Sequence, residues 1–196
     1  MRIPVTWLGS VFFLALIFLT ETRWEWSPLV EESLMLCACF FAGVGAFGRV
    51  WCALYIAGRK DQKLIREGPY ALCRNPLYFF SLLGAVGVGL ACESFTVPIL
   101  IAAGFALYYP SIILREEKRL REIFGVEYDD YRRKTPSFFP KWANGKTGEP
   151  AEWTVNPRVF RRAITDAVWF IWLIGLIEFA SACHEVGWLP ILLRLY

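Results

Sequence analysis

Histidine is almost absent from this sequence, and cysteine never occurs in a paired motif. The single histidine, His184, stands alone, and none of the 6 cysteines forms a Cys-x-x-Cys pair. Zinc sites and disulfide scaffolds need such clusters, so we expect neither a metal site nor a disulfide framework. A strong charge is also missing, since 21 Lys and Arg against 18 Asp and Glu leave a net charge of +3. Nucleic acid is therefore not an expected partner.

Apolar residues, in contrast, are abundant and are gathered into long runs. They make up 56% of the chain. The five runs cover residues 3–20, 33–57, 77–91, 97–114 and 164–182. Since about twenty apolar residues cross a bilayer, we predict an all-α, polytopic membrane protein with about five transmembrane helices. No small-residue cleavage site follows the first run, so we interpret it as a retained helix and not as a signal peptide.

The distribution of charge predicts the orientation of these helices. Lys and Arg gather in the connector after residue 57 and in the polar region after residue 114, whereas the loop between the first two runs is acidic. The positive-inside rule places both basic regions and the amino terminus in the cytoplasm. Residues 1–196 form one membrane domain, in a bacterial inner membrane or the endoplasmic reticulum. Its part 141–196 combines a polar, irregular excursion with the last transmembrane helix.

Two features within the apolar runs, a charged residue and a face of small residues, require an explanation. Arg49 interrupts the second run, either because it has a function inside the membrane or because it extends to the interface. In the third run Ser81, Ala85 and Gly89 recur every four residues and share a helical face with Gly84. A face of such small residues either packs against another helix or accepts a flat ligand.

Two connectors of unusual sequence flank the third and fourth runs. The first, residues 62–78, ends in Asn75-Pro76, an N-cap residue followed by the residue that suits the first helical position. The second, residues 115–131, continues the fourth run as a helix that we expect to end at Gly125. Because only a short turn joins the third and fourth runs, both connectors should meet at the cytoplasmic ends of one helical hairpin.

An acidic pair, Glu116-Glu117, lies one turn beyond the membrane-spanning part of the fourth run. Glu116 shares a face with Leu120 and Phe124, and Glu117 is spaced to pair with Arg121. One interpretation is a solvated helix with salt bridges. The other is a carboxylate that holds a cationic group, such as an ammonium or a sulfonium, or accepts hydrogen bonds from ribose hydroxyls.

The motifs GPY…RNPLY and EExxLxxxFGxEYxxY, in this order around a hairpin, resemble those of the integral-membrane methyltransferases. This superfamily includes isoprenylcysteine carboxyl methyltransferases and phosphatidylethanolamine N-methyltransferases. The resemblance covers residues 62–140, the expected cofactor-binding core. It implies S-adenosylmethionine bound between the two connectors on the cytoplasmic side, and a membrane lipid or isoprenoid as methyl acceptor. The expected partners are thus a lipid substrate and the bilayer itself.

The resemblance also implies roles for individual residues. The cofactor residues would be Gln62, Lys63, Leu64, Ile65, Tyr70, Asn75, Pro76, Leu77, Tyr78, Gly87, Gly89, Glu116 and Glu117. The catalytic residues would be Glu116, Glu117, Arg74 and Asn75. We expect Arg49, Arg115 and Tyr128 to contact the substrate. Methyl transfer from a sulfonium needs no metal, but an amine acceptor must lose a proton. Glu116, Glu117 and Glu127 are the candidate bases.

Two positions depart from the family pattern. Asn75 stands where the family carries a histidine, so this side chain cannot act as a base. Ile112 stands where the prenylcysteine branch carries an arginine, which favours a phospholipid or related polar lipid over a prenylcysteine carboxylate. Two alternatives stay open at this point. One is a membrane reductase of the sterol-reductase type, with a nicotinamide cofactor, and the other is a non-catalytic membrane subunit that keeps the fold.

Overall fold

The computed structural model describes residues 20–22, 27–59, 61–141, 154–188 and 193–195, and these parts are predominantly helical. The helices are α2 (Pro28–Ile56), α3 (Pro69–Leu72), α4 (Pro76–Leu90), α5 (Thr96–Phe124), α6 (Val126–Lys134) and α7 (Pro157–Glu185). Two three-residue segments, β1 (Thr20–Thr22) and β2 (Leu193–Leu195), pair in parallel. The predicted all-α fold is confirmed.

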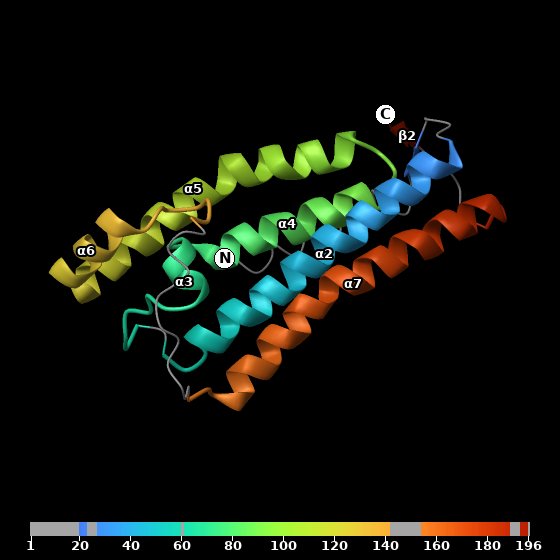
Figure 1. The fold of residues 1–196 in the computed structure, drawn as a ribbon. Helices are drawn as coiled ribbons and strands as arrows, with labels where there is room; N and C mark the ends of the chain where they lie inside the picture. Colours follow the sequence, from blue (N-terminus) through green and yellow to red (C-terminus); the bar gives the residue numbers. More distant parts are fainter. Residues whose placement is uncertain (1–19, 23–26, 60, 142–153, 189–192, 196) are drawn as a thin grey trace.

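Four helices run side by side, with α4 against α2, α5 and α7, and α7 also against α2 (Figure 1). Helices α2, α5 and α7 are long and apolar enough to cross a membrane. Helix α4 is apolar but has 15 residues, about 22 Å, which is less than the roughly 30 Å hydrocarbon core of a bilayer. The last four predicted runs each fall on one of these helices. The first run lies almost entirely outside the described residues, so five crossings and the cytoplasmic side stay predictions.

Small residues let α2 and α4 approach until their backbones touch. A Cβ atom placed on Gly45 would lie 2.5 Å from the Cα of Gly84, and one on Gly87 would lie 2.5 Å from the backbone nitrogen of Ala42. Phe170 of α7 covers Gly84 from the other side, since a Cβ there would meet its ring at 2.8 Å. Of the two roles expected for the small-residue face of α4, the structure shows helix packing.

The predicted hairpin is present, because α4 ends at Leu90 and α5 begins at Thr96. Helix α5 runs without a break past Pro110 and continues to Phe124. Gly125 then has a φ of 54°, a left-handed value that glycine adopts at little cost, and the chain turns into α6. The helix end predicted at Gly125 is confirmed.

The two connectors meet at one end of the bundle, where α3, α6 and the last turns of α5 gather (Figure 1). Buried side chains join them: Leu64 of the first connector packs with Tyr128 and Tyr131 of α6. Leu120 and Phe124 of α5 pack against this cluster. Segments about 60 residues apart in the sequence therefore form one structural unit, as the hairpin geometry predicts.

Candidate functional site

A pocket opens between the two connectors, and we call it the connector pocket. Its lining includes ten of the predicted site residues, namely Lys63, Leu64, Ile65, Tyr70, Arg74, Asn75, Pro76, Leu77, Tyr78 and Glu116. Sequence reasoning missed four further lining residues, Ile56, Asp61, Leu120 and Tyr131. The spacing of Leu120 from Glu116 pointed to that residue, since four residues make one helical turn. Tyr131 is the last residue of the second motif, EExxLxxxFGxEYxxY, whereas Ile56 and Asp61 belong to neither motif.

Glu116 and Tyr78 form the polar wall of the connector pocket. The Tyr78 hydroxyl donates a hydrogen bond to Oε2 of Glu116 at 2.8 Å. The ring of Tyr78 meets that of Tyr109 edge to face, with centroids 5.2 Å apart. This contact links α4 to α5 and fixes the direction of the tyrosine. A carboxylate in this setting has a defined position and can receive hydrogen bonds or a cationic group from a ligand.

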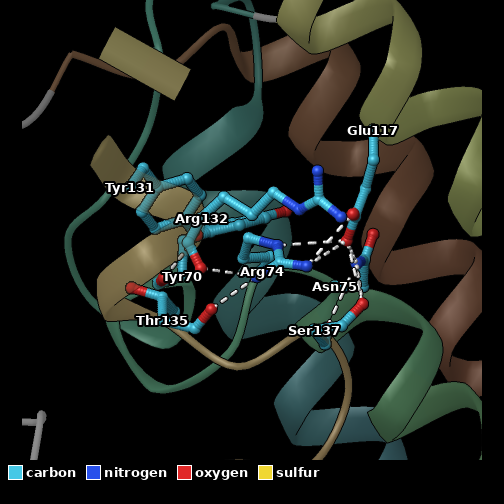
Figure 2. A network of polar contacts seen from close by, with 8 residues as sticks. All are labelled: Tyr70, Arg74, Asn75, Glu117, Tyr131, Arg132, Thr135 and Ser137. Carbon is cyan, nitrogen blue, oxygen red and sulfur yellow. Dashed lines mark hydrogen bonds and ion pairs between the residues drawn. The ribbon is translucent and has the colours of Figure 1, made fainter. Parts of the chain in front are cut away.

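Glu117 is buried in a polar network that Figure 2 shows, and we call Arg74, Asn75, Glu117 and Ser137 the Glu117 cluster. Arg74 donates through Nη2 to both carboxylate oxygens, at 2.9 and 3.0 Å, and through Nε to Oε1 at 3.1 Å. Asn75 Nδ2 and Ser137 Oγ donate to the same Oε1 at 3.0 and 2.8 Å. The Arg74 and Glu117 side chains are each 9% exposed, so the charges lie away from water.

The predicted partnership of Glu117 with Arg121 is wrong. Arg121 pairs with Asp129 at 2.9 Å and is largely exposed. Glu117 lies on the face of α5 that turns toward the first connector, where Arg74 occupies its carboxylate. Helical spacing alone could not identify this partner, because Arg74 comes from a distant part of the sequence.

Asn75 takes the N-cap position of α4, as predicted, but its side chain does not cap the helix. The side-chain amide donates instead to Glu117 and to the carbonyl of Ser137, the latter at 3.1 Å. The backbone N–H of Asn75 also donates to the Ser137 carbonyl at 3.1 Å. Asn75 therefore joins the start of α4 to the segment that follows α6.

Three further contacts hold the connectors together. The Tyr131 hydroxyl donates to the carbonyl of Tyr70 at 2.6 Å, and burial raises the pKa of Tyr131, so that it stays protonated. Arg119 pairs with Asp61 at 2.6 Å. Arg66 pairs with Glu127 at 2.7 Å on the exposed surface, and Glu127 does not line the connector pocket. Its predicted role as a base has no support from this position.

Gly87 and Gly89 lie away from the connector pocket. Gly87 contacts the backbone of α2, and a Cβ on Gly89 would lie 3.0 Å from backbone atoms of Pro98 in α5. Both glycines are buried between helices. The structure thus gives them a role in helix packing, and their role in cofactor binding stays a prediction.

The other predicted residues have different surroundings. Gln62 and Arg115 are exposed and do not line the connector pocket. Tyr128 is 1% exposed, and its hydroxyl has no hydrogen-bond partner among the described residues. Burial raises the pKa of Tyr128 to about 12, and the charge of Glu117 adds to this shift. Arg49 extends from α2 toward α4 and α7, and its side chain does not extend out of the bundle.

Comparison with known proteins places this arrangement in a family. A family model described as phospholipid methyltransferase matches residues 33–127. A protein-S-isoprenylcysteine O-methyltransferase of Schizosaccharomyces pombe is 32% identical over 81 residues, which cover 41% of this chain and 34% of that protein. The chain belongs to the integral-membrane methyltransferase superfamily. The matched part of the chain runs from α2 to the start of α6, so it includes the first connector and most of the second.

Two relatives match over nearly the whole chain. The cobalt-zinc-cadmium resistance protein CzcN of Cupriavidus metallidurans is 40% identical over 95% of this chain and 84% of its own length. The nickel-cobalt-cadmium resistance protein NccN of Alcaligenes xylosoxydans xylosoxydans is 35% identical over 92% of this chain and 83% of its own length. No solved structure matches the chain significantly. The chain therefore belongs to the same family as these two proteins.

Proposed function

We propose that this protein is an S-adenosylmethionine-dependent methyltransferase that acts on a membrane lipid or isoprenoid. A phospholipid or a related polar lipid is favoured over a prenylcysteine carboxylate. The observation that carries the proposal is the connector pocket, in which residues from both family motifs meet at the end of an apolar helical hairpin. A polar cofactor can bind there beside helices that contact lipid.

The chemistry of the pocket residues fits S-adenosylmethionine. This molecule carries ribose hydroxyls and an ammonium group, which a carboxylate can bind, and Glu116 supplies one beside Tyr78. Its own carboxylate suits a lysine, and Lys63 borders the pocket. Its adenine suits apolar walls such as Leu64 and Ile65. The cavity measures about 210 Å³, less than the roughly 300–1,000 Å³ of typical ligand pockets, so part of the molecule would extend past its opening.

When bound, S-adenosylmethionine supplies a methyl group on a positively charged sulfur. The protein must hold the acceptor in line with that methyl group and keep water away. Ile56, Leu77 and Leu120 give the pocket an apolar side that excludes water. We assign Glu116 as the group that can take a proton from an amine acceptor, because it lines the pocket. The carboxylate of Glu117 accepts hydrogen bonds from Arg74, Asn75 and Ser137, so we assign it as a positioning residue.

A phospholipid acceptor is supported by the description of the matching family and by position 112. Ile112 places an apolar side chain where the prenylcysteine branch carries its arginine. Two relatives are named as metal-resistance proteins. If this chain shares that physiological role, we propose that it contributes by methylating a lipid of the membrane in which it lies.

The first test is lipid labelling. Membranes with and without the protein receive methyl-labelled S-adenosylmethionine, and the extracted lipids are searched for label by mass spectrometry. We expect label in a polar lipid with the wild-type protein, and much less with Glu116→Gln. The control variant Arg133→Gln, which removes an exposed charge on α6, should label normally.

Binding measurements on the purified protein separate the alternatives. Absence of both label and S-adenosylmethionine binding would overturn the proposal. Binding of a nicotinamide nucleotide would then support the reductase, and binding of neither cofactor would support the non-catalytic subunit. Binding of S-adenosylmethionine without label would support the cofactor assignment and direct the search to acceptors missing from those membranes.

A further inference from the structure

Arg49 carries a charge inside the apolar part of the bundle. It lies in α2, seven residues before the end of the helix at Ile56. Its Nη1 donates to the hydroxyl of Ser81 in α4, and its guanidinium lies 5.8 Å from the ring centre of Phe170 in α7. The side chain is half-buried between three helices. It therefore points into the bundle, unlike an arginine that extends to the membrane surface.

Within the part of the chain that the structure describes, the charge of Arg49 has no anionic partner. A guanidinium has five N–H donors. Among the described residues, Arg49 donates one hydrogen bond and forms no ion pair, and its Nε is buried without a partner. The ring of Phe170 compensates only part of the cost of a buried charge. Because such charges in membrane helices are costly, an unpaired one is typical of a binding function.

Arg49 lies within one to two helical turns of residues that line the connector pocket. The Ser81 hydroxyl donates to the carbonyl of Leu77 at 2.7 Å, and Leu77 lines the pocket. Ser81 thus lies one helical turn, about 6 Å, from the pocket wall. On α2, Ile56 lines the pocket two turns, about 10 Å, beyond Arg49 and on the same face. Arg49 lies deeper along the bundle than the pocket, on the side where a lipid would extend.

We propose that Arg49 binds an anionic group, a phosphate or a carboxylate, of the amphiphilic methyl acceptor. The Ser81 hydroxyl orients the guanidinium, and the reactive group of the acceptor reaches the connector pocket about one turn away. This inference rests on the proposed function and narrows it, because it requires the acceptor to be negatively charged at this depth. It assigns substrate selection to α2, a helix outside both family motifs. Arg115, which is exposed, is not needed for it.

The test compares three single-chain ligands that differ at the head. The full chain, purified in a neutral detergent, is titrated with oleate, with oleoyl lysophosphatidic acid and with monoolein, which is neutral. We expect the wild-type protein to bind at least one anionic ligand about tenfold or more tightly than monoolein. Oleate and lysophosphatidic acid distinguish a carboxylate from a phosphate as the preferred group.

The preference should disappear in Arg49→Gln, survive in weakened form in Arg49→Lys, and remain complete in the matched control Arg133→Gln. Binding of S-adenosylmethionine, measured on the same samples, should be equal in all four proteins, so loss of the cofactor site is recognised separately. Equal preference in the wild-type protein and Arg49→Gln would overturn the proposal, as would no preference in the wild-type protein.

A second measurement on the wild-type protein avoids any folding defect of the variant. Phenylglyoxal modifies arginine side chains, and peptide mass spectrometry reports the rate at each site. The preferred anionic ligand should slow modification of Arg49 several-fold and leave Arg133 unaffected. Equal rates at Arg49 with and without ligand would contradict the proposal.

Discussion

Arg74 donates to both carboxylate oxygens of Glu117, at 2.9 and 3.0 Å, although 43 residues separate them in the sequence. Through Nη1, Arg74 also donates to the carbonyls of Thr135 and Arg132, at 2.6 and 3.0 Å. One guanidinium thus joins the first connector, α5 and the end of α6. The walls of the connector pocket depend on this junction, because Arg74 and the neighbouring Glu116 both line it.

We therefore expect Glu117 to contribute to stability and Glu116 to contribute to cofactor binding. Glu117→Gln leaves Arg74 buried without a counter-charge, and we expect a loss of about 3 kcal/mol, at the lower end of measured values because Gln keeps one acceptor. That loss corresponds to a fall of roughly 6–12 °C in the unfolding midpoint for a chain of this size. Glu116→Gln should keep its midpoint within about 2 °C and lose cofactor affinity. Thermal unfolding of the purified variants measures this, and equal midpoints would contradict the division.

Asn75 and Asn156 show what the sequence could and could not predict. Each precedes a proline at the start of a helix. The helix start at Asn75 was predicted, whereas α7 begins at Pro157, before the last apolar run that starts at residue 164. Asn156 accepts hydrogen bonds from the backbone of Arg158 and Val159, as an N-cap does. Asn75 does not, because Glu117 and the carbonyl of Ser137 lie within reach of its amide. The Asn-Pro pattern occurs at both helix starts, but only the tertiary fold determines which hydrogen bonds each asparagine side chain makes.

Asn75 should contribute to stability as a hydrogen-bond donor. Asn75→Leu keeps the approximate size and removes one donor to the charged carboxylate of Glu117 and one to the Ser137 carbonyl. We expect a cost of about 1–3 kcal/mol. Asn75→His keeps one ring N–H donor and should have a higher unfolding midpoint than Asn75→Leu. If the two variants unfold at the same temperature, the donor role is wrong.

The same distinction between local and distant information applies to the bundle. Apolar runs predicted four helices of the described chain, and the short turn predicted that both connectors meet. The sequence did not reveal which glycines touch a neighbouring helix. Gly43 has open space where a Cβ would be, whereas Gly45, two residues later, contacts the backbone of Gly84. Both belong to one small-residue segment, so only the packed structure separates them.

A substitution at Gly87 distinguishes a role in helix packing from a role in cofactor binding. A Cβ there would lie 2.5 Å from the backbone of Ala42, so Gly87→Ala must separate α2 from α4. We expect it to lower the unfolding midpoint by several degrees, a cost of about 1–3 kcal/mol. Gly104→Ala in α5, where nothing lies within 4 Å, is the matched control and should unfold like the wild-type protein. A stable Gly87→Ala variant that fails to bind S-adenosylmethionine would instead support the cofactor role.

Tyr78 should influence ligand binding through Glu116. Tyr78→Phe keeps the ring contact with Tyr109 and removes only the hydrogen bond to the carboxylate, which then has a less defined position. We expect S-adenosylmethionine to bind about tenfold more weakly, the effect of one hydrogen bond to a charged group. Isothermal titration of the purified protein measures this. Tyr108→Phe, on the exposed side of α5, is the control and should bind normally. Unchanged affinity in Tyr78→Phe would show that the carboxylate position does not depend on this bond.

The raised pKa of Tyr128 predicts that the folded protein loses stability at alkaline pH. Burial, with the charge of Glu117, raises its pKa to about 12 in the folded protein, against about 10 in an unfolded chain. Since the raised value belongs to the folded state, its contribution is fully present below pH 10. This contribution is lost as pH rises toward 12, because the unfolded chain releases its proton first.

Tyr128→Phe should thus lose less stability than the wild-type protein between pH 9 and 11, while Tyr131 contributes equally to both. At pH 8 the variant should be at least as stable, since the Tyr128 hydroxyl has no partner among the described residues. Parallel pH profiles in thermal unfolding would contradict this assignment.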